Sequence, residues 1–546
     1  DLQKFSHWKK VLNHHHILPP WLCDFAECKE LNIEYINDNI LEIHLRTGND
    51  IVHEDPDGTE IKPVWQSDTK YNKLQQGAID SDGWQYFDNS AELRHAGYTV
   101  QVIAFFVQWD DDQLTKIIDK FITNETLLVG FSCTFFLPKE KPHVKWVGRA
   151  GVRDLIMDED GEEKEGSLER IQGGGKNRGS LRGAENDIRH GNPGNLSILF
   201  GRENVFDIFD YVKQRAPNSK IVVGGARSFV AEDEPYNYKV DYVLSGQSDV
   251  SILALADHVL YGSSLKVAYK KNACSVITEK DYPVENFTTS RILYQDNDLI
   301  FDKEILPIEI ARGCIFKCSF CSYSLIGKRV WEFNRAPELV AADLIDAYNK
   351  FGSTGFMFCD DTYNDSVDKV EGLHKEFIKL PFELTFSTYG RADMLVSKPH
   401  TAALLYESGM RSVFFGIETL NHESGKAVGK GMDPERLKDG LYKAKEVPGW
   451  KDIVTSSGII TGLPFDTVET TQATFDWLLR EDCPLDSYSV APFTINPESA
   501  IGKNMEKFGY KWDENGEWYS KWMTEAIARE LALEYRNKMI TKPRRR

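Results

Sequence analysis

The sequence predicts an α/β protein with two successive parallel-sheet domains, the second of them a partial barrel of six strand–helix units. Two observations predict this class. Short, nearly continuous apolar runs alternate with helical stretches over residues 89–270 and again over residues 305–497, as they do in parallel sheets that helices cover on both faces. The chain of 546 residues is also several times longer than one typical domain, and 41% of it is hydrophobic, which is enough to build more than one core.

The first region, residues 89–270, contains four expected helices and four expected strands. We expect the helices at residues 90–96, 112–122, 206–215 and 250–260, with Gly97 ending the first of them. We expect the strands at residues 98–106, 127–136, 220–223 and 240–244. Ligands of such sheets bind beyond the carboxyl ends of the strands, where Gly224-Gly225 and Ser245-Gly246 fall.

A glycine-rich insertion, residues 148–194, interrupts this region and contains Gly173-Gly174-Gly175-Lys176. These residues lack the spacing of a phosphate-binding loop, G-x-x-x-x-G-K-[ST], and no expected strand precedes them. We therefore interpret the insertion as a flexible loop that substrate orders, and not as a nucleotide site. Residues 1–88 have no legible role, and residues 271–304 are expected to be a linker.

The second region, residues 305–497, repeats the strand–helix alternation six times. We expect its strands at residues 306–310, 355–358, 382–386, 412–417, 453–460 and 487–491. The helices begin near residues 336, 366, 400, 434 and 467, and Pro337 and Pro434 suit a first helical turn. In such a barrel, the loops at the carboxyl ends of the strands carry the chemistry. Residues 498–546 are expected to be helical, with one amphipathic helix at 525–539 and a basic tail at 542–546.

The chain is acidic, with 65 Lys and Arg against 84 Asp and Glu and a net charge of −19. This balance argues against a general nucleic-acid binder, because affinity for the phosphate backbone depends on Lys and Arg. No run approaches 18 apolar residues, and no signal peptide is visible. We therefore expect a soluble, cytoplasmic protein that does not act at a membrane.

Three of the nine cysteines, Cys314, Cys318 and Cys321, fall within one short stretch directly after the first expected barrel strand. A disulfide framework would call for an even number of cysteines in a small secreted chain. Three thiolates on one loop can instead ligate three irons of a four-iron cluster and leave the fourth iron open to a small molecule. The alternative is a zinc knuckle completed by a distant fourth ligand, since no histidine lies nearby in the sequence.

The stretch from Cys314 to Cys321 resembles the signature of the radical S-adenosylmethionine (SAM) superfamily, C-x-x-x-C-x-aromatic-C, with Phe320 as the aromatic residue. Three further segments are similar to the subgroup that has an N-terminal cobalamin-binding-type domain: Ala311-Arg-Gly-Cys314, Arg335-Ala-Pro-Glu338 and Phe358-Cys-Asp360-Asp361-Thr-Tyr363. The resemblance covers roughly residues 95–495. It implies a Rossmann-like N-terminal domain followed by a partial (β/α)6 TIM-type radical SAM barrel.

The resemblance also implies cofactors and a mechanism. Cys314, Cys318 and Cys321 would hold a [4Fe-4S] cluster whose fourth iron binds the amino and carboxylate groups of SAM. The reduced cluster would cleave SAM, and the resulting 5′-deoxyadenosyl radical would abstract hydrogen from the substrate. An external electron donor such as flavodoxin or ferredoxin would reduce the cluster.

The resemblance carries several further residues into the SAM site. Phe320 would lie near the adenine, and Asp360 and Asp361 would face the amino group. The remaining contacts to ribose, carboxylate or adenine would come from Ser387, Arg391, Glu418, Ile460 and Gly462. The acid that usually ends the G-x-I-x-G motif is replaced by Phe465. An Asp pair is also typical of helix caps, and ordinary packing at strand ends explains the other positions equally well.

Strand-end motifs of the first region resemble those of cobalamin-binding Rossmann-like domains. The residues that would contact cobalamin are Ser132, Gly224, Gly225 and Gly246. No D-x-H-x-x-G occurs in the sequence, so no histidine is marked as a lower ligand to cobalt. Members of the subgroup often lack this histidine, and the sequence therefore permits cobalamin without requiring it.

We interpret the chain as a cobalamin-dependent radical SAM methyltransferase that acts on an unactivated carbon. One alternative is an epimerase, a cyclase or another hydrogen-abstraction enzyme that works without cobalamin. In that case Cys359 and Cys483 are candidate hydrogen donors, unless both are simply small buried core residues. A non-catalytic, metal-stabilised binding protein is the alternative from another class. A peptide, a small metabolite or an RNA loop all remain open as substrates.

Overall fold

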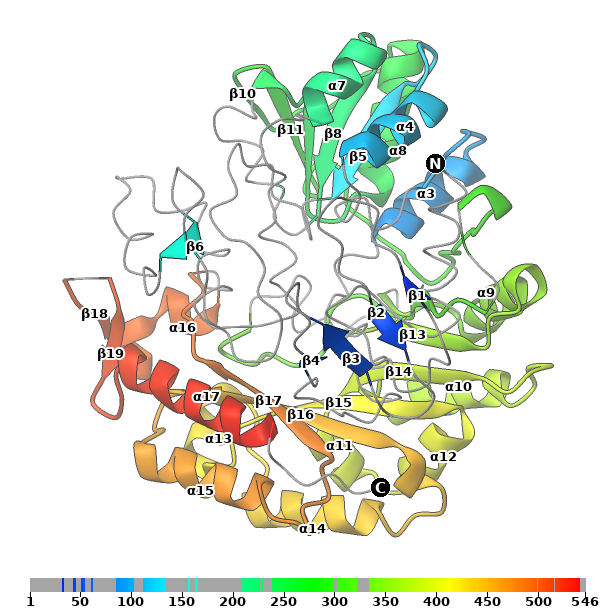
Figure 1. Cartoon of the computed structure of the whole chain (residues 1–546). Coiled ribbons are helices and arrows are strands. Elements are labelled where there is room, and N and C mark those ends of the chain that lie inside the picture. Colours follow the sequence, from blue (N-terminus) through cyan, green and yellow to red (C-terminus); the bar gives the residue numbers. More distant parts are fainter. Residues whose placement is uncertain are drawn as a thin grey trace. The chain divides into compact units, whose positions relative to one another are not determined.

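The computed structural model describes residues 85–102, 111–132, 208–225, 238–298, 303–321, 333–497, 499–514 and 516–540, positions 228 and 300, and the backbone of six short N-terminal strands (Figure 1). Most of the expected insertion at 148–194, the basic tail, and parts of the strands expected at 98–106 and 127–136 lie outside these residues. The described chain falls into two compact units, one within residues 80–301 and the other within residues 302–546.

The six short strands form two small antiparallel sheets apart from the main ones. Four of them pair in the order β1-β2-β3-β4: β1 (Asn32–Ile33), β2 (Ile43–Leu45), β3 (Ile51–Glu54) and β4 (Glu60–Ile61). The other two, β6 (Ile156–Met157) and β7 (Glu163–Lys164), pair with each other.

The first unit contains a five-stranded sheet in the order β10-β11-β9-β8-β5. Its strands are β5 (Leu128–Ser132), β8 (Lys220–Gly224), β9 (Tyr242–Ser245), β10 (Tyr269–Lys271) and β11 (Cys274–Thr278). Four strands run parallel, and only β10 pairs antiparallel, with β11. The parallel Rossmann-like sheet is confirmed, but the expected linker at 271–304 begins too early, because residues 274–278 form a central strand of this sheet.

Helices cover both faces of the first sheet because alternate residues of its strands are buried on opposite sides. The four helices are α3 (Gln85–His95), α4 (Asp111–Phe121), α7 (Ile208–Arg215) and α8 (Asp249–Tyr261). Val223 and Val243 pack with the apolar side of α4 and α7. Val222 and Leu244 pack on the other face, against α8.

A buried ion pair ties the end of the first unit to its first helix. The two terminal guanidinium nitrogens of Arg94 in α3 donate to the carboxylate of Asp298, and they also donate to the carbonyl oxygens of Leu293 and Val100. Asp298 belongs to the short 3-10 helix η9 (Asp296–Asp298). Residues 293–298 are therefore packed structure of the first unit and not a free linker.

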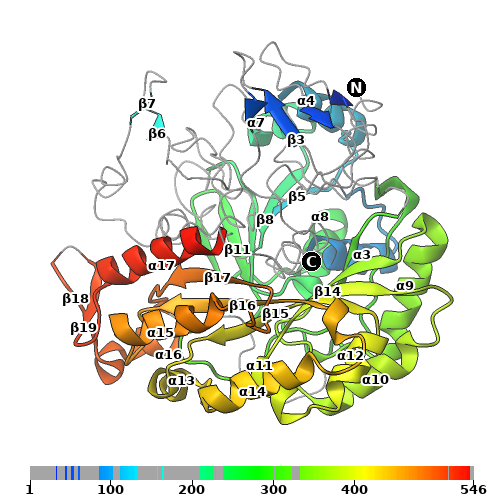
Figure 2. The same cartoon turned by 60° about the horizontal axis from the view of Figure 1, so that its bottom comes forward.

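The second unit contains six parallel strands in sequential order, β12-β13-β14-β15-β16-β17. Figure 2 labels β14, β15, β16 and β17 of this sheet. The six strands are β12 (Leu306–Glu309), β13 (Gly355–Cys359), β14 (Thr385–Gly390), β15 (Met410–Glu418), β16 (Val454–Thr461) and β17 (Ser487–Pro492). Every neighbouring pair is parallel. The expected partial barrel is confirmed, and the six carboxyl ends share one edge of the sheet.

Helices that follow the strands form the outer layer of the barrel. They are α9 (Pro337–Phe351), α10 (Val367–Phe377), α11 (Ala392–Ser397), α12 (Thr401–Glu407), α13 (His422–Val428), α14 (Pro434–Ala444) and α15 (Val468–Leu478), with the 3-10 turn η11 (Trp450–Asp452). Aromatic side chains fill the layer between strands and helices, where the rings of Phe358 and Phe386 stack at 4.1 Å and Phe377 of α10 packs on both. Because side chains alternate along a strand, Cys359 and Ser387 point to the opposite, inner side.

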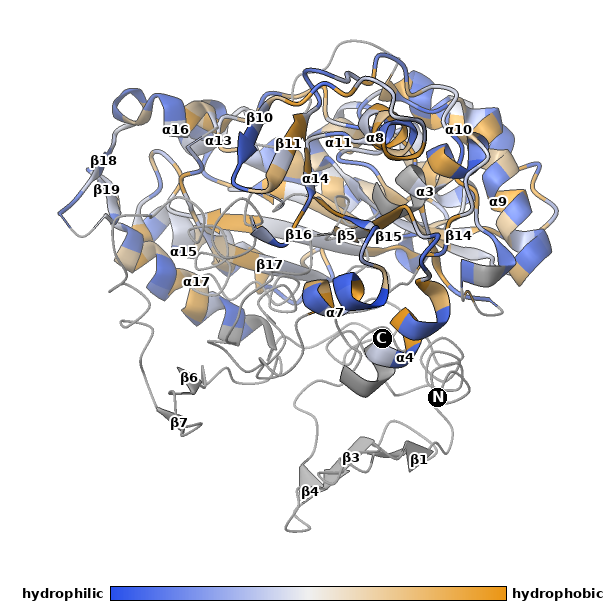
Figure 3. Ribbon diagram, turned by 90° about the horizontal axis from the view of Figure 1, so that it is seen from above, coloured by the Kyte–Doolittle hydropathy of each residue, from blue (hydrophilic) through white to orange (hydrophobic). Residues whose placement is uncertain are grey.

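The C-terminal part adds α16 (Ala500–Lys503), the 3-10 helix η12 (Met505–Phe508), the hairpin β18 (Tyr510–Trp512) and β19 (Trp518–Ser520), and α17 (Glu525–Ile540). The helix at 525–539 is thus present, although the region also contains a hairpin. Helices α9 and α17 show hydrophilic and hydrophobic residues along their length (Figure 3). Among the described residues, no helix combines the length and apolar character needed to cross a membrane.

Candidate SAM and iron–sulfur site

The three clustered cysteines lie on the loop that follows β12, at the carboxyl edge of the barrel. All three are free thiols, and all three are partly exposed. Ser319, in the middle of this loop, anchors it to α13, since its backbone N–H donates to Val428 O at 3.2 Å and its hydroxyl to Ala427 O at 3.1 Å. The loop is therefore held to α13 directly after Cys318.

Two arginine–carboxylate pairs fix the start of the loop. Arg312 bonds both carboxylate oxygens of Glu309, at 2.8 and 3.0 Å. Arg335 donates to Glu309 O at 2.9 Å and forms an ion pair with Asp343 in which both side chains are completely buried. A bidentate pair such as Arg312–Glu309 defines geometry as well as charge. The two pairs therefore fix the conformation of the chain between the end of β12 and Cys314.

The thiols have different surroundings. Cys314 Sγ lies 3.2 Å from the hydroxyl of Thr362, and burial raises the pKa of this thiol. The guanidinium of Arg391 donates to Cys318 Sγ at 3.3 Å. A metal that displaces the thiol protons would find a hydroxyl at one sulfur and a fixed positive charge at another.

Arg391 is held by more contacts than the sequence suggests. It bonds both oxygens of Asp393, at 2.9 and 2.6 Å, it donates to Gly429 O, and it stacks on the ring of Phe316 at 3.8 Å from the centroid. Phe316 and Cys318 belong to the cysteine loop, so Arg391 ties the end of β14 to that loop. The structure places this arginine beside a cluster thiol, and its contact with the ribose or carboxylate of SAM stays a prediction.

The predicted Asp pair divides into two roles. Asp360 is 1% exposed, and its carboxylate lies 2.6 Å from Lys369 Nζ and accepts from Thr362 N at 2.9 Å. Lys369 is buried too and donates to Thr362 O. Asp360 therefore shapes the loop that brings Thr362 to Cys314, whereas partly exposed Asp361 lies near enough to Cys314 to help raise its pKa.

Ser387 lies on the inner side of β14 and is 2% exposed. Among the described residues, its hydroxyl has no hydrogen-bond partner. A buried hydroxyl without a partner is uncommon, and a polar ligand inside the barrel would satisfy it.

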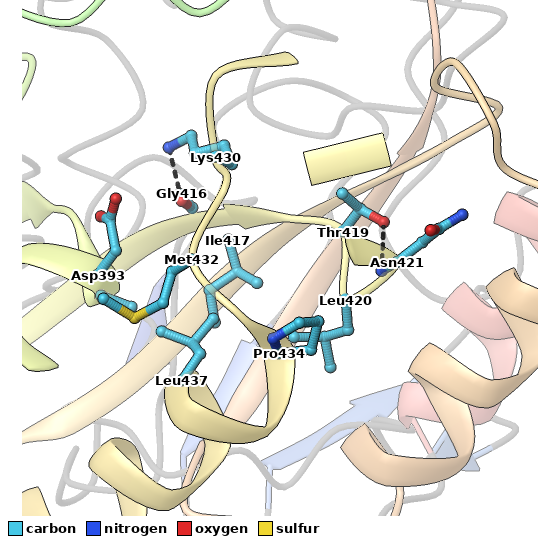
Figure 4. A pocket seen from close by; sticks show the side chains of 11 residues that line it. Asp393, Gly416, Ile417, Thr419, Leu420, Asn421, Lys430, Met432, Pro434 and Leu437 are labelled. Atoms are coloured by element: carbon cyan, nitrogen blue, oxygen red, sulfur yellow. Dashed lines mark hydrogen bonds between the residues drawn. The ribbon is translucent and has the colours of Figure 1, made fainter. Parts of the chain in front are cut away.

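Glu418 ends β15 in a left-handed backbone conformation with φ of +68°, next to a register shift against β16. Burial raises the pKa of its carboxyl group, while Lys430 at 3.7 Å lowers it. Figure 4 shows the adjoining shallow pocket, in which Lys430 reaches the carbonyl oxygen of Gly416 and the Thr419 hydroxyl accepts from Asn421 N. The strand end thus presents a partly buried acid and a lysine side by side.

The G-x-I-x-G segment lies in β16 and the turn after it. Ile460 is partly exposed in the strand, and Gly462 has a φ of +90°. A Cβ at Gly462 would lie 2.7 Å from the ring of Trp518. This glycine is therefore required by packing against the C-terminal hairpin.

Phe320, for which a place near the adenine was predicted, is partly exposed on the cysteine loop.

Sequence reasoning missed Asp466, which follows the position where the motif acid is absent. Asp466 is 3% exposed and accepts from Asn421 Nδ2 at 3.2 Å and from the Thr419 hydroxyl at 3.4 Å. Burial raises its pKa to about 7. The sequence signal that could have found it is an acid one residue after the position where the motif acid is expected. Its hydrogen bonds to Asn421 and Thr419 show that Asp466 stabilises the loop that follows Glu418.

Comparison with known proteins identifies the barrel. Residues 308–478 match the family model of the radical SAM superfamily. This match lies within the barrel, which is therefore a radical SAM domain.

Two curated relatives and one solved structure resemble this chain over longer stretches. An uncharacterized methyltransferase of Pyrococcus horikoshii is 26% identical over 282 residues, 49% of this chain and 59% of the relative, so the chain spans about three fifths of that protein. The bacteriochlorophyllide d C-12(1)-methyltransferase of Chlorobaculum tepidum is 22% identical over 62% of this chain and 71% of its own. The radical SAM methyltransferase TsrM of Kitasatospora setae, solved with cobalamin and a [4Fe-4S] cluster, has the same fold, with a TM-score of 0.51 at 14% identity over 80% of this chain and 78% of its own.

A [4Fe-4S] cluster and SAM are the cofactors of this superfamily, and the described residues fit them. In the described part of the chain, no three His, Cys, Asp or Glu side chains converge as ligands of one ion. A cluster does not need such convergence, because each thiolate binds a different iron. Three free thiols on one anchored loop, with Arg391 and Thr362 as their hydrogen-bonding neighbours, are the donor set that such a cluster uses.

The residues that the sequence assigns to cobalamin lie along one edge of the first sheet. Ser132 and Gly224 end the neighbouring strands β5 and β8, and Gly225 and Gly246 follow β8 and β9 with φ of +91° and +87°. A Cβ at Gly246 would clash with the carboxylate of Glu279, which follows β11. The structure brings these strand ends together, and it shows a packing reason for Gly246.

The two candidate hydrogen donors lie at opposite ends of the barrel. Cys359 is the last residue of β13, buried on the inner side and paired in register with Glu309 at the site edge. Cys483 is also buried, but it precedes β17 and lies at the amino ends of the strands. This position favours the alternative that Cys483 is a core residue, because a hydrogen donor must reach a substrate beside the cysteine loop. The hydrogen-donor role of either cysteine stays a prediction.

Proposed function

We propose that this chain is a cobalamin-dependent radical SAM methyltransferase that acts on an unactivated carbon. The observation that carries the proposal is the order of its parts. A Rossmann-like sheet whose strands β8 and β9 run into glycine turns precedes a barrel whose first strand runs into the three-cysteine loop. The names of both curated relatives and the fold of TsrM support the same activity.

The cysteine loop would hold the cluster and SAM together. A bound cluster supplies the electron that cleaves SAM, and its three thiolates come from Cys314, Cys318 and Cys321. The residues around the cluster ligands would contribute electrostatic stabilisation. Arg391 and the Thr362 hydroxyl lie at hydrogen-bonding distance from two of the sulfurs and stabilise their negative charge once they are ionised.

Polar groups at the neighbouring strand ends suit the charges of SAM. Carboxylates can accept from its ammonium group and a lysine can pair with its carboxylate. Asp361 and Glu418, both partly exposed, supply carboxylates for the ammonium group, and Lys430 beside Glu418 supplies the charge for the carboxylate. The unpartnered hydroxyl of Ser387 lies on the inner face of the strand between them.

The first unit would carry the methyl group on cobalamin. The sequence contains no histidine motif that could ligate the cobalt. The glycine turns at the carboxyl ends of β8 and β9 would therefore hold the cofactor through backbone contacts and a complementary shape. Gly224 and Gly225 leave space there because they have no side chain, and the φ of Gly225 suits glycine.

The test is SAM turnover followed by mass spectrometry on anaerobically reconstituted protein, with reductant, with and without added cobalamin. We expect S-adenosylhomocysteine that depends on cobalamin, together with 5′-deoxyadenosine. Deoxyadenosine alone, unaffected by cobalamin, would replace the methyltransferase with a hydrogen-abstraction enzyme and make Cys359 the residue to mutate. A protein that loads iron but forms neither product would contradict the enzymatic proposal itself.

A further inference from the structure

Two buried hydroxyl groups lie on neighbouring strands inside the barrel. Ser387 of β14 is 2% exposed, and Ser412 of β15 is 1% exposed. The two residues are register partners in the parallel pair β14–β15, so their side chains leave the sheet on the same face. Among the residues that the structure describes, neither hydroxyl has a hydrogen-bond partner. We call Ser387 and Ser412 the serine pair.

The next serines on the same face are satisfied. Ser456 of β16 is in register with Ser487 of β17, and their hydroxyls bond each other at 2.9 Å. A serine hydroxyl can donate one hydrogen bond and accept two, and burying it with none of them is unfavourable. Buried side chains in this state are uncommon in folded proteins. The serine pair therefore suits a polar group that the fold itself does not supply.

The serine pair faces the interior of the barrel and not its outer helices. Phe386, the residue before Ser387, stacks on Phe358 and packs on Phe377 of α10. Alternation along the strand puts Ser387, and with it Ser412, on the other face. Bulky branched side chains usually fill the interior of such a barrel. Two serines at neighbouring inward positions occupy less of that interior than such side chains would.

Two aromatic rings lie nearer to the carboxyl edge on the same two strands. Tyr389 and Phe414 each follow a member of the serine pair by two residues, and both are partly exposed. Their rings meet edge to face, with the centroids 5.4 Å apart. A ligand that enters from the carboxyl edge would therefore pass aromatic surface before it reaches the serine pair.

The inward positions around the serine pair are uncharged. From the level of the pair to the carboxyl edge, the inward positions of the six strands hold two charged residues, Glu309 and Glu418, and each is the last residue of its strand. The register neighbours of the pair itself are Met357 on β13 and Val454 on β16. An ionised group buried at this level would find no opposite charge on these strands, which makes its burial costly. The pair therefore suits an uncharged group.

We infer that the serine pair is a substrate-binding site. It takes the uncharged hydroxyl, carbonyl or amide end of a molecule whose ring or apolar part lies against Tyr389 and Phe414. The inference rests on the proposed function, because it takes the molecule in the barrel to be the methyl acceptor. Ser387 precedes Arg391, which contacts the cysteine loop, by about 13 Å of strand. The anchored end thus lies well inside the barrel, and the reacting carbon belongs to the other end of an elongated substrate.

The experiment measures the binding of three small probes to the anaerobically reconstituted full-length chain. On the same ring, para-cresol carries a hydroxyl group, para-toluate a carboxylate group and para-xylene a second methyl group. The variants are Ser387→Ala, Ser412→Ala and the double variant. The control is Ser457→Ala, because Ser457 of β16 is equally buried but its hydroxyl already donates to Gly458 O at 3.1 Å.

Three readouts separate substrate binding from SAM binding and from folding. They are the Kd of each probe by ligand-observed NMR, the Kd of SAM by equilibrium dialysis, and the midpoint of urea unfolding. We expect the parent to bind para-cresol about tenfold more tightly than either other probe, because only its hydroxyl bonds both serines. The double variant should lose this preference, and Ser457→Ala should keep it. The double variant should retain the parent's Kd for SAM and its urea midpoint, because a hydroxyl without a partner does not stabilise the fold.

Equal affinities of the three probes for the parent, or a preference that survives in the double variant, would overturn the site. Weaker SAM binding in Ser387→Ala with para-cresol binding unchanged would also overturn it, because Ser387 would then be the SAM contact that the family resemblance implies. A lower urea midpoint in the double variant would mean that the hydroxyls serve the fold, and it would overturn the site as well. A parent that binds para-cresol through the serine pair but forms neither S-adenosylhomocysteine nor 5′-deoxyadenosine refutes the proposed function and supports the binding site.

Discussion

Asp466 is predicted to make the stability of the barrel depend on pH near neutrality, and Asp466→Asn is predicted to remove this dependence. The carboxyl group is 3% exposed, and burial raises its pKa to about 7 from an ordinary value of 3.8, against hydrogen bonds from Asn421 and Thr419 that lower it. An acid whose pKa is raised on folding binds its proton more tightly in the native state. Stability then falls as pH rises from the unfolded to the folded pKa.

The size of the effect follows from the two pKa values. With a native pKa of about 7, the native state holds most of this proton at pH 6 and little of it at pH 8, while the unfolded state holds almost none at either. Linkage then gives a loss of about 1.4 kcal/mol of unfolding free energy between pH 6 and pH 8. Asparagine keeps a carbonyl oxygen for Asn421 and Thr419 and cannot ionise, so the variant lacks this loss.

The assay is urea unfolding of the full-length chain at several pH values from 6 to 8.5, in wild type and Asp466→Asn. The difference between the two proteins is the quantity to read, because every other titrating group, histidines included, is common to both and cancels. We expect the variant to gain about 1.4 kcal/mol relative to wild type from pH 6 to pH 8. Parallel profiles would refute the reasoning, since they would mean that the carboxyl group keeps one charge state over the whole range.

Four further outcomes are expected. Cys314→Ala, like alanine at either other cluster cysteine, should abolish the cluster and SAM cleavage, and iron retained at the parent level would contradict the ligand assignment. Asp361→Ala should weaken SAM binding in equilibrium dialysis without loss of iron, whereas Asp360→Ala should also destabilise the chain, because Asp360 is buried against Lys369. Lys369→Met leaves buried carboxylate unpaired and should lower the unfolding free energy by about 3–5 kcal/mol, and an unchanged urea midpoint would disprove the burial argument. Arg391→Gln removes a positive charge beside Cys318 Sγ and should therefore lower the midpoint potential of the cluster by tens of millivolts in an EPR-monitored titration, where 59 mV for one electron corresponds to about 1.4 kcal/mol. An unaltered potential would show that Arg391 does not interact with the cluster sulfur.

The strands of the barrel could be predicted because each of them is a short apolar run between turn signals. The largest error is at β14, expected at residues 382–386 and observed at Thr385–Gly390. After Phe386 the strand is no longer apolar, since Ser387 faces the barrel interior. A rule based on apolar runs does not recognise such residues as part of a strand. The strand β11 was missed for a different reason, since its parallel partner β9 lies about thirty residues away and no local pattern records that pairing.

The cysteines of the site could be predicted, but the use of the surrounding charges could not. Spacing alone marks three thiols on one loop. The direction of a long side chain depends on what surrounds it in the fold, so the contacts of Arg391 with Cys318 and Phe316 on the cysteine loop could not be predicted from its place in the sequence. Likewise, a neighbouring pair of acids looks uniform in sequence, although Asp360 is locked by Lys369 and Asp361 is partly exposed.

Backbone strain at the carboxyl edge explains why Asp466 matters to the proposed SAM site. Among the described non-glycine residues, Glu418 and Phe465 share the rare φ of +68°, and they follow the neighbouring strands β15 and β16. Such conformations cost on the order of 1–3 kcal/mol each and persist only where surrounding contacts hold them. Asn421 supplies those contacts, because its side chain donates both to Phe465 O at 2.9 Å and to Asp466 at 3.2 Å. The carboxyl group of Asp466 thus braces the two strained turns at once, and a change in its charge is felt at Glu418 through Thr419, its neighbour in the chain.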